Sequence, residues 1–131
     1  TPVRFQAQAR NAVGTGPLSG LSTAVTPATT PGAPVIGTAS PGAVGGTITA
    51  IARWNPPTST GGATITGYVV IALRMNANGT IARQTTSAVQ AASTRSLTMT
   101  LTAGNYRFTV RARNRLGLGA TSARSRLATA R

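Results

Sequence analysis

Residues 106–125 read YRFTVRARNRLGLGATSARS, and this stretch decides the fold. In residues 106–113 apolar and polar side chains alternate, which is the period of a strand with one buried face. The side chains predicted to face the core are Tyr106, Phe108, Val110 and Ala112. The glycines in residues 114–119 predict a tight turn, which leads into a last strand at about 120–129. The stretch therefore predicts two antiparallel strands at the end of the chain.

The same pattern occurs a second time in residues 3–22, which read VRFQAQARNAVGTGPLSGLS. Residue 3 aligns with residue 106, an offset of 103, and no gap is needed. A repeat of about 100 residues indicates tandem domains. We therefore expect residues 1–26 to be the closing hairpin of a preceding domain. Residues 27–33 read as a Pro-rich, extended linker, and residues 34–131 as one complete domain.

Between the two copies the sequence predicts short strands with turn signals between them, which is typical of a β-sandwich. Residues 47–54 alternate, and the face predicted to be buried carries Ile48, Ala50, Ala52 and Trp54. Further strands are predicted at 65–75, 80–85 and 95–101. In the last of these, the inward residues are Leu97, Met99 and Leu101. Asn78 and Gly79 predict a hairpin turn, because both residue types accept positive φ.

Several of these residues in combination resemble the pattern of a fibronectin type III domain. The matching array is Trp54-x-Pro-Pro57, Gly67-Tyr68, Leu101-x-x-Gly104-x-Tyr106-x-Phe108-x-Val110-x-Ala112-x-Asn114 and Gly117-x-Gly119-x-x-Ser122. The resemblance covers nearly all of residues 32–131. It implies an all-β, immunoglobulin-like β-sandwich of seven short antiparallel strands in two sheets. It also implies that residues 1–26 are the C-terminal F–G hairpin of a preceding repeat.

The same resemblance implies roles for individual residues. Trp54 corresponds to the core tryptophan of strand B, Tyr68 to the core tyrosine of strand C, and Tyr106 to the tyrosine corner. The expected core is Trp54, Tyr68, Leu97, Leu101, Tyr106, Phe108 and Val110. The corner departs from the family pattern in two ways: Ala103 replaces the usual proline, and the turn is one residue shorter. The Ala-, Thr- and Gly-rich style resembles tandem repeats in secreted and surface proteins of high-GC Gram-positive bacteria.

Composition argues against catalysis. All 13 basic residues are Arg, and the chain has no Asp, Glu, His, Lys or Cys. General acid–base catalysis and metal coordination depend on those missing side chains. We therefore expect no enzyme activity, no catalytic residue, no cofactor, no metal site and no small-molecule substrate.

The formal net charge is +13, and three explanations for the missing acids remain open. The chain binds a polyanion, it works in an acidic medium, or the sequence is of artificial origin. No apolar run is long enough to cross a membrane. Because the sequence lacks an initiator Met, it reads as a mature or internal fragment.

Two candidate sites follow from these patterns. The outer face of residues 106–113, together with the strand beside it, forms a candidate anion-binding row of Arg107, Arg111, Arg113, Arg115, Arg124 and Arg126. The alternative is an ordinary solvated strand face. Leu116 and Leu118, in the turn between the last two strands, are candidate recognition residues. Their alternative is a simple turn with covered leucines.

The expected function is that of a non-enzymatic spacer or adhesive module in a secreted or cell-surface protein. One alternative is a module that binds cell-wall polymer or nucleic acid through the arginine row. Another is a subunit of an extracellular filament or virion surface, built by strand addition. The expected partners are protein neighbours, either a preceding repeat or another copy of the chain, and an anionic polymer.

Overall fold

Strand β10, Gly104–Asn114, is the centre of the larger sheet. The computed structural model describes residues 2–22 and 27–131, so residues 1 and 23–26 of the predicted hairpin lie outside it. β10 runs antiparallel to β6, Gly67–Met75, from Tyr106 opposite Arg74 to Arg113 opposite Gly67. The other edge of β10 holds β11, Gly117–Thr121, and β12, Ala128–Ala130. The free edge of β6 pairs with β7, Ile81–Thr86, and β8, Gln90–Ala91.

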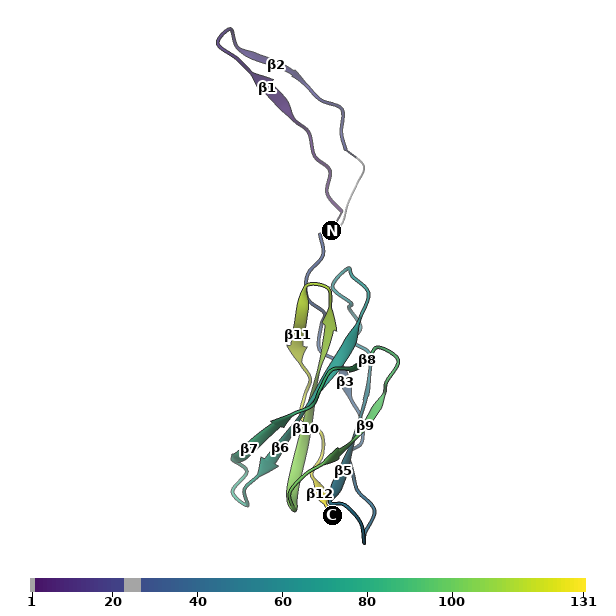
Figure 1. Ribbon diagram of the computed structural model, residues 1–131. Helices are drawn as coiled ribbons and strands as arrows, with labels where there is room; N and C mark the ends of the chain where they lie inside the picture. Colours follow the sequence, from purple (N-terminus) through teal and green to yellow (C-terminus); the bar gives the residue numbers. More distant parts are fainter. Residues whose placement is uncertain (1, 23–26) are drawn as a thin grey trace.

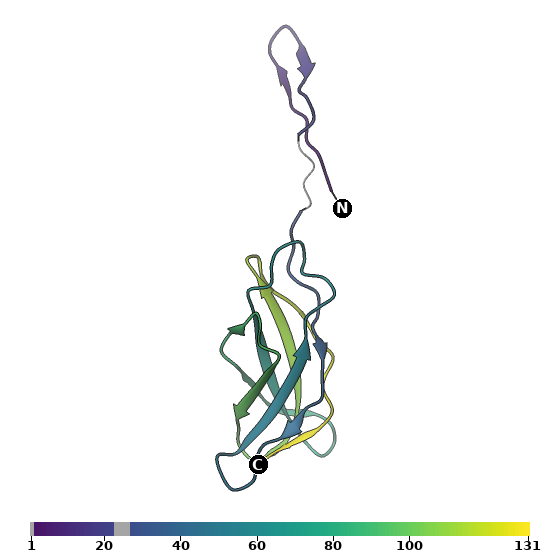
Figure 2. The ribbon, with the colours of Figure 1, turned by 90° about the vertical axis from the view of Figure 1, so that its right-hand side faces the viewer.

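The second sheet is built on β5, Thr49–Asn55. It pairs with β3, Val35–Ile36, with β4, Ser40–Pro41, and with β9, Ser96–Thr100. The pairs β3 and β4, β7 and β8, and β11 and β12 each read as one interrupted strand. Counted in this way, seven antiparallel strands form two sheets that face each other (Figures 1 and 2). The predicted all-β sandwich is confirmed.

The core lies between the two sheets. Its largest fully buried side chains include Trp54 from β5, Tyr68 from β6 and Phe108 from β10. Leu101, Tyr106 and Val110 are buried with them, whereas Leu97 is partly buried and packs against this cluster. The Tyr106 hydroxyl donates to the Thr102 carbonyl at 2.9 Å. The hydrogen bond of the tyrosine corner therefore forms, despite Ala103 and the shortened turn.

The last strand differs from the prediction. It begins at Gly117, not near residue 120, and it is interrupted between β11 and β12. In the interruption Ser122 and Ser125 are buried, and their hydroxyls accept hydrogen bonds from the Val110 and Phe108 amides at 2.9 Å. Each serine amide donates back to the carbonyl of the same partner residue. The two hydroxyls therefore replace the carbonyls that a regular ladder would offer.

One smaller prediction was wrong and another was confirmed. Ile48 was expected in the core, but it is 37% exposed, because β5 begins at Thr49, two residues later than predicted, and Ile48 lies outside the strand. The hairpin turn predicted at Asn78 and Gly79 is present between β6 and β7, and of these two residues only Gly79 has positive φ, 85°. The Gly79 amide donates to the Asn76 carbonyl, and the Asn76 amide to that of Thr80.

The predicted linker is attached to the sandwich from Thr29 onward. The Thr29 amide donates to the Gly61 carbonyl, the Gly32 amide to Ser59 and the Ala120 amide to Pro31. Pro31 is buried, and a Cβ on Gly119 would collide with its carbonyl oxygen. This part of the linker is therefore part of the fold.

Residues near the N-terminus form a separate hairpin of β1, Gln8–Arg10, and β2, Thr15–Leu18 (Figure 1). Ser19 and Ser22 repeat the serine arrangement of the last strand. Their hydroxyls accept from the Ala7 and Phe5 amides at 2.8 Å, and their own amides donate back to the same two residues. The repeat detected in the sequence is therefore also a repeat of hydrogen bonds.

The described part of the chain is built of strands and turns. Within residues 2–22 and 27–131 no helix has the length and apolar character needed to cross a membrane.

Candidate ligand-binding face

The candidate site is the outer face of the larger sheet, opposite to the core. Arg107, Arg111 and Arg113 alternate along β10 with the buried residues of that strand. Across the sheet, Arg107 pairs with Leu73 and Arg111 with Val69. The predicted row is therefore interleaved with apolar side chains from β6.

These apolar residues of β6 were not identified from the sequence as part of the candidate site. Tyr68, Val70 and Ala72 face the core and are at most 1% exposed, so the intervening Val69, Ile71 and Leu73 must face outward. Val69 and Leu73 are nevertheless only 6% and 4% exposed. The uninterrupted apolar run in residues 68–73 was the available signal, because a strand with one wet face would alternate.

A hollow of about 460 Å³ lies on this face. Its lining comes from four strands and the segment that follows β11, and it includes Val69, Ile71, Leu73, Ile81, Leu118, Thr109, Arg111 and Arg124. Thr109, which lies on the same outward face of β10 as Arg107 and Arg111, is 6% exposed and lines the hollow. The hollow is apolar along β6, polar at Thr109, and positively charged at one side.

The predicted arginine row is only partly assembled. Arg124 and Arg126 were expected in the last strand, but both lie in the segment between β11 and β12. Arg124 borders the hollow, whereas the Arg126 Nε donates to the Ala39 carbonyl, beside β4. Arg115 and Leu116 form the turn between β10 and β11 and are exposed. Leu118 lines the hollow and is 36% exposed.

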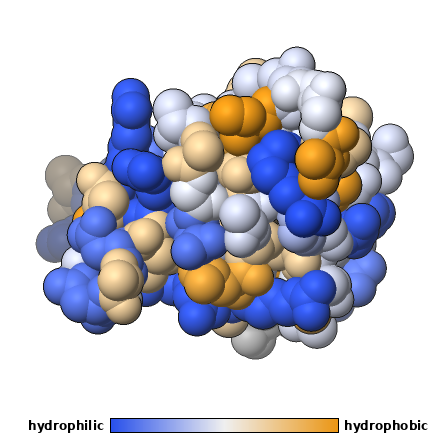
Figure 3. Space-filling view, turned by 90° about the horizontal axis from the view of Figure 1, so that it is seen from below, coloured by the Kyte–Doolittle hydropathy of each residue, from blue (hydrophilic) through white to orange (hydrophobic). Residues whose placement is uncertain are grey.

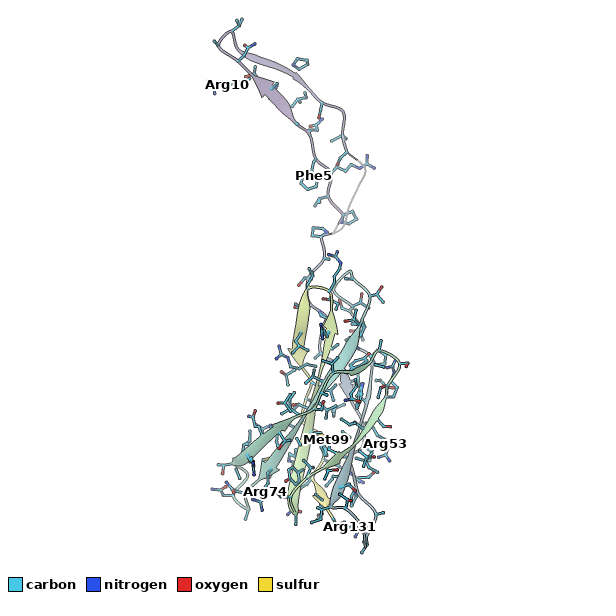
Figure 4. The ribbon with its side chains drawn as sticks, viewed as in Figure 1. Phe5, Arg10, Arg53, Arg74, Met99 and Arg131 are labelled. Carbon is cyan, nitrogen blue, oxygen red and sulfur yellow. The ribbon has the colours of Figure 1, made fainter. Side chains whose placement is uncertain are left out.

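Backbone carbonyls take the place of the missing carboxylates. The arginines that donate to carbonyl oxygens are Arg53, Arg74, Arg95, Arg107, Arg111, Arg126 and Arg131. Three of these, Arg53, Arg74 and Arg131, are labelled on the sandwich in Figure 4. Among the described residues, the guanidinium groups without a hydrogen-bond partner belong to Arg4, Arg10, Arg83, Arg113, Arg115 and Arg124. Not every arginine is therefore free for an outside partner.

A second hollow, of about 580 Å³, lies beside the Tyr68 ring. The Arg95 guanidinium stacks over that ring at 5.5 Å and donates to the Ala92 and Thr94 carbonyls. The nearby Trp54 ring is tilted 51° to Tyr68, and its buried indole N–H has no partner in the described chain. The arrangement stabilises the fold and offers no reactive group.

The end of the sandwich that carries the C-terminus has scattered apolar patches, which are separated by hydrophilic ones (Figure 3). The described residues contain no cluster of metal-ligating side chains.

No protein-family model matches the sequence, and no curated protein gives a significant match. Solved structures do match the fold. Domains A168-A170 from titin superpose with a TM-score of 0.63 at 20% identity, covering 98% of this chain and 41% of theirs. The FN5 domain of Drosophila Lar gives 0.55 at 23% identity, with 76% and 96% covered. The fourth FNIII domain of a human protein gives 0.55 at 27% identity, with 83% and 86% covered.

The chain thus spans less than half of the titin fragment and most of each of the two single domains. The matched structures are fibronectin type III domains or contain them, and such domains are typically non-catalytic structural modules. The sandwich of this chain is fibronectin type III-like.

Proposed function

We propose that the chain is a non-enzymatic structural module of a tandem array in a secreted or cell-surface protein. One observation carries this proposal: the hairpin in residues 5–22 reproduces the hydrogen bonds of residues 108–125 without the rest of a sandwich. The Phe5 amide and the Phe108 amide each donate to a serine hydroxyl, Ser22 and Ser125 respectively.

The hairpin carries an exposed apolar face, which supports this proposal. Phe5 is 62% exposed, whereas the matching Phe108 is fully buried. The sticks in Figure 4 place Phe5 on the hairpin, away from the sandwich. An isolated two-stranded hairpin is marginally stable in water, and burial against further strands stabilises it. We infer that a preceding repeat supplies those strands.

A fusion protein tests this inference. Residues 29–103 are placed directly before Thr1, because Thr1 aligns with Gly104 in the repeat. If the hairpin completes a sandwich, Phe5 becomes protected and a second cooperative unfolding transition appears. The control fusion carries Phe5→Gln and should show the original transition only. A hairpin that stays exposed in the unaltered fusion would overturn the proposal.

Strand addition between copies is the alternative outcome for the same hairpin. Its face would then be covered by another copy, and head-to-tail contacts of this kind produce open fibres. Light scattering of the unaltered chain at high concentration separates the two cases. A monomer supports the tandem array, and concentration-dependent growth supports the fibre.

A second candidate function is binding of an anionic polymer. It is favoured by Arg113, Arg115 and Arg124, which are exposed and have no hydrogen-bond partner among the described residues. Retention on a heparin column should fall with salt and should weaken further with Arg113→Gln and Arg115→Gln. Arg83→Gln, on β7, is the matched control. Equal retention of all three proteins would contradict a local site.

A further inference from the structure

The hollow on the outer face of the larger sheet has an apolar stretch along β6, with Thr109 of β10 beside Ile71. Val69, Ile71 and Leu73 line it from β6, Ile81 from β7 and Leu118 from β11. In both ribbon views no described element packs over this face (Figures 1 and 2). Its volume of about 460 Å³ lies within the range of small-molecule sites.

The charged side of the hollow is preorganised. The Arg111 Nε donates to the Gly119 carbonyl at 2.8 Å, which orients the side chain. Its two terminal amino groups have no hydrogen-bond partner in the described chain. Arg124 borders the same hollow without a partner in the described chain. The sequence contains no carboxylate side chain that could neutralise either charge.

Two ligand classes fit this geometry poorly. A polyanion would leave these apolar residues uncovered, because phosphates and sulfates gain nothing from contact with Ile71 and Ile81. An extended peptide would lay its amides over a sheet whose backbone groups already pair within the ladder. Those amides would lose water without gaining a partner.

We propose that this hollow binds a free amphipathic carboxylate with a long alkyl chain. The alkyl chain lies against Ile71, Ile81 and Leu118, the apolar lining residues that are still partly exposed, where burial of apolar surface is favourable. The carboxylate lies between Arg111 and Arg124 and accepts charge-assisted hydrogen bonds. This site does not depend on the tandem array or on polymer binding.

Decanoate, below its micellar concentration, is the probe. Methyl NMR signals of Ile71, Ile81 and Leu118 should shift on titration with a saturable profile. Arg111→Gln combined with Arg124→Gln should weaken decanoate at least about tenfold, which corresponds to 1.4 kcal/mol. The same variant should leave binding of the uncharged decanol unchanged. Arg83→Gln, outside the hollow, should match the unaltered chain.

The single variant Arg124→Gln is the control for loss of structure. It should fold like the unaltered chain, because the Arg124 side chain has no hydrogen bond to lose within the described chain. It should weaken decanoate by a smaller factor. Ile71→Thr keeps the β-branch and should weaken decanoate and decanol alike. Methyl signals that do not move, or that move equally in the arginine variants, would overturn the proposal. So would polyphosphate producing the same methyl shifts as decanoate.

Discussion

Asn114 donates from its side-chain amide to the Thr29 carbonyl at 2.8 Å, across 85 residues of chain. The same amide donates to Thr60 at 3.0 Å, and its oxygen accepts from the Leu116 amide at 2.9 Å. One side chain, 1% exposed, thus joins the linker, the loop after β5 and the turn after β10. The end of the sandwich that faces the hairpin is organised around it.

Replacing Asn114 should therefore destabilise the sandwich. Asn114→Ala removes the partner of the Thr29 and Thr60 carbonyls and of the Leu116 amide, at a cost of about 1 kcal/mol or more. Urea unfolding followed by Trp54 fluorescence measures the change. The matched control is Asn11→Ala, at the equivalent position of the exposed hairpin. A loss in both variants, or in neither, would contradict the role assigned to Asn114.

The serine pair between β11 and β12 gives a second prediction. Ser125→Ala removes the acceptor of the buried Phe108 amide, so the free energy of unfolding should fall by about 1–3 kcal/mol. Hydrogen exchange at the Phe108 amide should accelerate in the variant. Ser19→Ala, in the hairpin, is the control and should leave the unfolding of the sandwich unchanged. Unaltered exchange at Phe108 would show that the hydroxyl is dispensable.

The sandwich could be predicted from the sequence because alternation and turn residues are local signals. Trp54, Tyr68 and Phe108 lie on strands whose apolar period was visible. The interruption of the last strand could not be predicted, since a serine hydroxyl replaces a carbonyl only when a particular partner strand is in place. Ser122 and Ser125 look like ordinary polar residues until β10 lies beside them.

In the candidate site too, local features could be predicted from the sequence and long-range contacts could not. Alternation along β10 placed Arg107 and Arg111 on one face correctly, but their attachment to carbonyls depends on contacts distant in sequence. Arg126 was assigned to the row because a regular strand was assumed. The apolar stretch at Val69 and Leu73 was accessible to sequence reasoning, since a run of six apolar residues must cover both faces of a strand.

The contribution of the tyrosine corner to stability can be tested by removing the hydroxyl of Tyr106. Tyr106→Phe removes the hydroxyl that donates to the Thr102 carbonyl and also contacts the Thr102 side-chain oxygen at 3.1 Å. The ring stays buried, so the expected loss is about 1 kcal/mol. Thermal unfolding measures it, and Thr102→Ala, which keeps the backbone carbonyl, should cost less. Equal losses would assign the stabilisation to the hydroxyl–hydroxyl contact instead.

Stability should be almost independent of pH between about pH 5 and 7. The chain has no Asp, Glu or His, so no side chain ordinarily titrates in that range. Proton uptake is then equal in the folded and unfolded states, and the slope of the free energy of unfolding with pH is near zero. Calorimetry in buffers of equal ionic strength measures this slope. A change of the melting temperature by more than about 2 °C across that range would contradict it, since about 1 kcal/mol corresponds to roughly 4–8 °C.

Salt should stabilise the chain, because its 13 positive charges repel one another and no side-chain ion pair offsets them. Raising the ionic strength from 0.01 M to 0.15 M shortens the Debye length from about 30 Å to about 8 Å. We expect the melting temperature to rise across this interval, by several degrees if the repulsion is of order 1 kcal/mol. Scanning calorimetry with NaCl measures the rise.

The control for this salt prediction removes charge without removing a hydrogen bond. Arg113→Gln with Arg115→Gln deletes two charges whose side chains have no partner in the described structure. At low salt this variant should melt higher than the unaltered chain, and the difference should shrink as salt is added. A melting temperature that falls with NaCl would instead mean that attraction to the carbonyl oxygens outweighs the repulsion, because screening weakens both.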